Sequence, residues 1–90
     1  MATVRIEGVE FELDDAARFA RRLERASYGA SKAGLSPAHA LAIEIEEAVD
    51  VSGGAVAIRE EAREIAFAVL DEWYPTAPES ARRLRLVLGQ

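Results

Sequence analysis

The chain of 90 residues contains no cysteine, a single histidine and a single lysine. The absence of cysteine excludes disulfides, thiolate catalysis and every cysteine-ligated zinc or iron–sulfur site. The lone histidine, His39, cannot supply the several imidazole ligands that a transition-metal site usually needs, and no histidine-based catalytic triad is evident. We therefore expect no cofactor and no enzymatic activity, and we interpret His39 as a surface or boundary residue of a helix.

The sequence also lacks a long apolar run. No window approaches the ~18 apolar residues of a membrane span, and the N-terminal stretch MATVRIEGVEFEL has no basic segment followed by an apolar one. A cytoplasmic protein that does not enter a membrane is expected. The net charge is −5, whereas most proteins that bind nucleic acid by neutralising its phosphates carry a net positive charge. The composition therefore favours protein partners over nucleic acid.

Half of the residues are apolar and 30% are charged, which is typical of a globular protein. Residues 1–90 are expected to form one small domain with a modest core. A second subunit or a partner protein that covers more apolar surface would supplement so small a core, so homo-oligomerisation is expected.

The N-terminal region shows the alternation of apolar and polar residues that is typical of β-strands, over Thr3–Leu13. A two-residue turn at Glu7 and Gly8 would place the large apolar side chains on one face of a hairpin. The pairs would be Val4 with Phe11 and Ile6 with Val9. Glutamate is not the preferred residue at the first turn position, so a bulged three-residue loop is an alternative. Either connection predicts an N-terminal β-hairpin.

Apolar residues at helical spacing, with start and stop signals, indicate about four helices. They run from the N-cap Asp14 to about Tyr28, from Ser36–Pro37 up to the Ser52–Gly53–Gly54 break, from about Glu60 to Trp73, and from Pro78–Glu79 to Leu88. The segment GASKAGLS between the first two, which carries Lys32, is predicted to be a flexible connection. The last helix is expected to make apolar contacts through Leu84, Val87 and Leu88.

The stretch AVAIREE after Gly54 could be a strand or the start of a helix. A weak similarity between VEFELDDAARFARRL and VAIREEAREIAFAVL favours a third strand near residues 55–58. The predicted fold class is therefore α+β and predominantly helical.

The second helix carries four acids, Glu44, Glu46, Glu47 and Asp50, and its only basic side chain is that of His39. Calcium loops need a D-x-D-x-D-G type of pattern that is absent, and a catalytic carboxylate pair needs unequal environments that a sequence cannot show. We interpret these residues as a solvated acidic face or one that docks on a basic surface, with Glu44 and Glu47 as candidate contact residues.

Basic residues gather on the first helix and near the C-terminus. They are Arg18, Arg21, Arg22 and Arg25, and then Arg82, Arg83 and Arg85. No interleaved aromatic set and no known nucleic-acid-binding motif accompanies them. We expect both groups to meet the acids of the second helix or of a second subunit, with Arg21, Arg22 and Arg25 as candidate contact residues.

Trp73 and Tyr74 end the third helix and are candidate interface anchors, because aromatic residues are enriched among binding hot spots. Trp73 could instead close the core. The sequence thus favours a non-enzymatic protein-binding or regulatory module that associates with another protein or with itself. The alternative is a small nucleic-acid-associated regulator that uses its arginine faces, and its binding should weaken steeply with salt.

Overall fold

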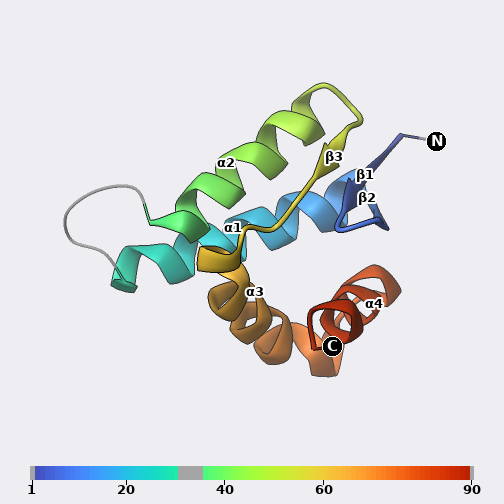
Figure 1. Ribbon diagram of the computed structural model, residues 1–90. Coiled ribbons are helices and arrows are strands. Elements are labelled where there is room, and N and C mark those ends of the chain that lie inside the picture. Colours follow the sequence, from blue (N-terminus) through green and yellow to red (C-terminus); the bar gives the residue numbers. More distant parts are fainter. Residues whose placement is uncertain (1, 31–35, 90) are drawn as a thin grey trace.

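The computed structural model describes residues 2–30 and 36–89 of the chain. Its elements follow in the order β1 (Thr3–Ile6), β2 (Val9–Glu12), α1 (Leu13–Ala30), α2 (Pro37–Asp50), β3 (Ala55–Val56), α3 (Glu60–Trp73), the 3-10 turn η1 (Tyr74–Thr76) and α4 (Glu79–Leu88). The predicted α+β, predominantly helical fold is confirmed. In Figure 1 the small sheet lies beside α1 and α2, and α3 and α4 lie together on the other side of α1. No helix in the described part of the chain is both long and apolar enough to cross a membrane.

The predicted hairpin has the expected register, with Val4 opposite Phe11 and Ile6 opposite Val9. The two-residue connection is the correct alternative, since Glu7 and Gly8 both have positive φ, at 52° and 80°. Two successive positive φ values are the signature of the type I′ turn, whose twist matches that of the strands.

The third strand is confirmed but is shorter than the predicted span of 55–58. β3 pairs in parallel with β1, so that the sheet order is β2-β1-β3. A parallel partner reaches its position by a crossover, and α1 and α2 supply it here. Ile58 lies beyond the strand, where its N–H is bonded to a side chain of the hairpin turn.

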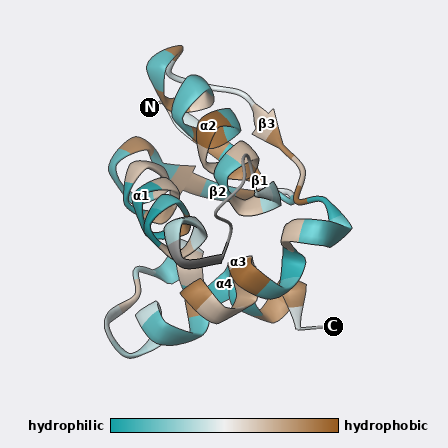
Figure 2. Cartoon of the chain, turned by 90° about the vertical axis from the view of Figure 1, so that its left-hand side faces the viewer, coloured by the Kyte–Doolittle hydropathy of each residue, from teal (hydrophilic) through white to brown (hydrophobic). Residues whose placement is uncertain are grey.

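The core forms where the inner face of the sheet meets the helices. Phe19 of α1 lies between Phe11 of β2 and Trp73 of α3, with ring centroids 6.2 and 6.4 Å away in stacked orientation. Because these three rings come from the sheet and two helices, they join both parts of the molecule into one core. Figure 2 shows the matching amphipathic pattern, with hydrophobic and hydrophilic residues alternating around α3 and α4.

The helix boundaries differ from the predictions in detail. Asp14 is not the N-cap of the first helix, because α1 begins at Leu13, directly after β2. At the other end α1 continues through Ala30, so Gly29 belongs to the helix; residues 31–35 of the predicted flexible connection, including Lys32, lie outside the described residues. Ser36 is the N-cap of α2 as predicted, and its Oγ accepts the N–H of His39 at 3.1 Å.

One expected core contact of the last helix is wrong. Leu84 and Leu88 are buried, but Val87 remains 40% exposed. The buried face of α4 is centred on Ser80, Ala81, Leu84 and Leu88, which puts Val87 at its margin.

Candidate protein-binding surfaces

Trp73 lies inside the molecule, with 4% of its surface exposed. One ring neighbour is Phe19, and the guanidinium carbon of Arg22 lies 4.8 Å from the Trp73 ring centroid. The exposed Arg22 therefore covers the indole from the solvent side through a cation–π contact. Trp73 thus fills the core, and the next residue in the sequence is Tyr74.

Tyr74 is 44% exposed and begins the 3-10 turn that follows α3. Guanidinium groups of two α4 arginines lie over its ring, that of Arg85 at 4.8 Å and that of Arg82 at 5.7 Å. Arg85 is itself held by Asp71, whose Oδ1 accepts hydrogen bonds from Nη2 at 2.6 Å and Nε at 3.2 Å. We call Tyr74, Asp71, Arg82 and Arg85 the Tyr74 corner. Its aromatic ring is both exposed and held in place.

The α1 arginines form an unpaired basic face. Arg18, Arg21 and Arg25 are exposed and have no ion-pair partner within residues 2–30 and 36–89. Arg22 and Arg25 also line a hollow of about 330 Å³ between α1 and α3. The expected pairing with the acids of the second helix is absent, because α1 packs against α2 through its apolar stripe while the arginines occupy the opposite side.

The acids of α2 are likewise exposed and have no ion-pair partner in the described ranges. Glu44 and Glu47 line one wall of a groove of about 570 Å³ whose other wall is the backbone of Gly53–Ala57. Val51, at the end of α2, contributes an apolar side chain that is 75% exposed. No group of three or more His, Asp or Glu side chains placed to hold a metal ion occurs among the described residues.

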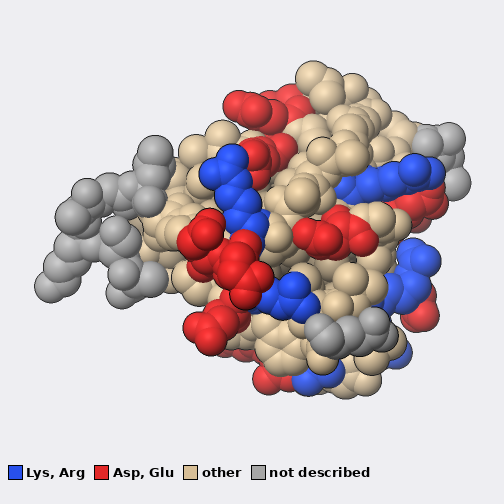
Figure 3. Space-filling model, in the orientation of Figure 1, with Lys and Arg blue, Asp and Glu red and all other residues tan. Residues whose placement is uncertain are grey.

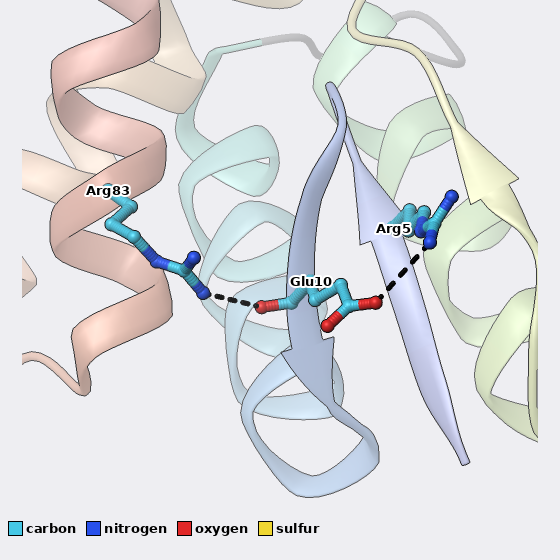
Figure 4. Close-up of polar contacts among 3 residues, drawn as sticks. All are labelled: Arg5, Glu10 and Arg83. Carbon is cyan, nitrogen blue, oxygen red and sulfur yellow. Dashed lines mark hydrogen bonds and ion pairs between the residues drawn. The ribbon is translucent and has the colours of Figure 1, made fainter. Parts of the chain in front are cut away.

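The two edges of the sheet differ, a feature that the sequence analysis missed. The edge formed by β2 is covered by α4, from which Arg83 Nη2 donates a long hydrogen bond of 3.4 Å to the carbonyl oxygen of Glu10 (Figure 4). On the solvent face of the hairpin, Glu10 also forms an ion pair with Arg5 at 3.4 Å (Figure 4). Within residues 2–30 and 36–89, no side chain donates a hydrogen bond to the edge formed by β3 in this way. Only the tertiary placement of α4 reveals this difference, so no local sequence signal could have found it.

Two further features are a hollow and the single histidine. A hollow of about 810 Å³ lies between the start of α1 and the start of α4 and is lined by acids from both, with Arg83. His39 has an intermediate exposure and its ring lies 6.4 Å from that of Tyr28, in agreement with the interpretation as a boundary residue.

Comparison with known proteins finds no matching family model, no curated relative and no solved structure with a similar fold.

Proposed function

We propose that this chain is a non-enzymatic protein-binding module whose docking point is the Tyr74 corner. The observation that carries the proposal is that Tyr74 is a half-exposed aromatic ring held against the guanidinium groups of two arginines of α4. Tyrosine, tryptophan and arginine are the residue types most enriched in hot spots, and a ring that is already fixed loses little conformational freedom on binding. Arg82 and Arg85 place positive charge at the Tyr74 ring, which favours an acidic partner segment.

The test is capture of partners from the source cell's lysate, after nuclease treatment, by the tagged wild-type chain and by two variants. A hot-spot tyrosine contributes about 2 kcal/mol or more, so Tyr74→Ala should weaken capture of the specific partner by roughly 30-fold. Tyr28→Ala is the matched control, because Tyr28 is the other exposed tyrosine and lies on α1, far along the chain from the Tyr74 corner. Equal capture by Tyr74→Ala and wild type would refute the proposed docking point.

A nucleic-acid-associated regulator is the second candidate, and the unpaired Arg18, Arg21 and Arg25 favour it. In that case the nuclease would abolish capture, and binding would fall steeply with salt because phosphate contacts release counterions. The net charge of −5 favours the protein-binding proposal, and so does the burial of Phe19, the aromatic side chain between Arg18 and Arg21, because a buried ring cannot stack on a base.

A further inference from the structure

The structure points to a second interaction surface, at the outer edge of β3. β1 uses the carbonyl oxygens of Gly54 and Val56, which accept hydrogen bonds from the N–H groups of Arg5 at 2.9 Å and Glu7 at 3.0 Å. Successive residues of a strand send their N–H and C=O groups to opposite sides. The backbone groups of Ala55 therefore face away from the sheet, and those of Ala57, which directly follows β3, have no hydrogen bond to β1.

These outward groups have no partner in the described parts of the chain. No hydrogen bond to the N–H or C=O of Ala55 or Ala57 is present there, and both side chains are exposed. An exposed strand edge of this kind is a template for another strand. The β2 edge differs, because there Arg83 of α4 donates a hydrogen bond to the carbonyl oxygen of Glu10, whereas no described side chain bonds the outward groups beside β3.

The surroundings of the β3 edge specify its occupant. An added strand would lie over the groove between β3 and α2, where Glu44, Glu47 and the apolar Ala48 and Val51 form the opposite wall. In Figure 3 the surface at the position of β3 is largely uncharged, and acidic side chains gather over α2 and over the start of α3. Arg59 is the only base among the groove residues, so the wall favours a strand with basic side chains.

We propose that the β3 edge binds an extended segment of a partner protein whose alternate side chains are basic. A second copy of this chain fits the edge poorly, because pairing β3 with β3 would bring Glu44 and Glu47 of both copies together. The edge offers outward groups from two residues only, so backbone pairing alone would be weak and the charge of the groove supplies selectivity. This surface is separate from the Tyr74 corner and does not depend on it.

The test uses the ¹⁵N-labelled full chain and short synthetic peptides of alternating Val and Lys or alternating Val and Glu. The Val–Lys peptide should shift the amide resonances of Ala55 and Ala57 and slow their hydrogen exchange, and the Val–Glu peptide should not. Ala57→Pro removes one outward N–H without removing a bond to β1, and it should weaken Val–Lys binding at least about fivefold.

Charge reversal tests whether the acidic side chains of the groove select a basic peptide, and it leaves the backbone of the β3 edge unaltered. The double variant Glu44→Lys with Glu47→Lys should reverse the preference in favour of the Val–Glu peptide. Glu46→Lys with Asp50→Lys is the matched control, because it changes the charge of the same helix equally at residues that do not line the groove. At about 0.15 M salt its effect should be the smaller of the two, since exposed charges that do not line the groove are partly screened.

Three results would overturn the proposal. The first is that the Val–Lys peptide leaves the Ala55 and Ala57 amides unchanged at millimolar concentration. The second is that both peptides bind equally well, which would remove the role of the acids. The third is broadening of these two amides with protein concentration in the absence of peptide, which would assign the edge to a second copy. Tyr74→Ala should bind the Val–Lys peptide like wild type, so this proposal and that for the Tyr74 corner can fail independently.

Discussion

Glu7 combines a turn position with a long-range contact. Asparagine is the preferred residue at this place in a type I′ turn. The Glu7 carboxylate, however, accepts the N–H of Ile58 at 2.6 Å, across 51 residues of sequence. The bond ties the chain that leaves β3 to the tip of the hairpin. A glutamate that weakens the local turn signal in the sequence therefore has a structural use that becomes apparent only in the fold.

Replacing Glu7 by alanine tests this contact. Removal of the carboxylate should lower the free energy of unfolding by about 0.5–1 kcal/mol and should accelerate hydrogen exchange of the Ile58 amide. Glu12→Ala serves as the control, because Glu12 is also an exposed acid of the hairpin and its side chain has no hydrogen bond in the described ranges. Unchanged exchange at Ile58 in Glu7→Ala would show that the bond does not persist in solution.

At the scale of the elements, the stack of Phe11, Phe19 and Trp73 joins the sheet to the helices. Phe19 is fully buried between the other two rings. Phe19→Ala should lower the free energy of unfolding by about 3–5 kcal/mol, which is a large part of the stability of a small domain. Val87→Ala, at the margin of α4, should cost much less. Chemical denaturation followed by circular dichroism measures both, and similar losses for the two variants would contradict this description of the core.

The sequence predicted those elements whose signals are local. The alternation from Thr3 to Leu13 defined the hairpin register, and Ser36–Pro37 defined the start of α2. It could not place Val87, because which face of α4 is buried depends on how that helix meets α3. The expected pairing of the α1 arginines with the α2 acids is absent for the same reason, since residues on neighbouring helices pair only if their faces meet.

The candidate site was partly predictable. Tyr74 was selected from its position at a helix end, and its arginine neighbours Arg82 and Arg85 were recognised only as a separate basic patch. Their contact with Tyr74 requires α4 to fold back along α3. The groove beside β3 was not predicted at all, because its walls come from backbone and helix residues that have no shared motif.

At the scale of the whole molecule, uncompensated charges lie on separate helices. Arg18, Arg21 and Arg25 of α1 have no acid partner, and Glu46 and Asp50 of α2 have no basic partner, within the residues described. We propose that copies of the chain associate by bringing these two faces together. Such contacts close into a two-fold dimer if both pairs of faces meet at once, and otherwise form rings or open chains.

Analytical ultracentrifugation at two ionic strengths tests self-association. Oligomers should be present at low salt and should dissociate at about 1 M salt, where the Debye length falls to roughly 3 Å. The double variant Arg18→Ala with Arg25→Ala should be monomeric under both conditions. A monomeric wild type at low salt, or oligomers indifferent to salt and to this variant, would exclude association through these charges.

The central claim, that the chain binds another protein through the Tyr74 corner, is tested most directly by the footprint of a captured partner. Hydrogen exchange and side-chain labelling of the purified, nuclease-treated complex would be compared with those of the free chain. The account predicts that Tyr74 loses its accessibility and that exchange slows over η1 and the start of α4. A complex in which Tyr74 remains as accessible as in the free protein would contradict it.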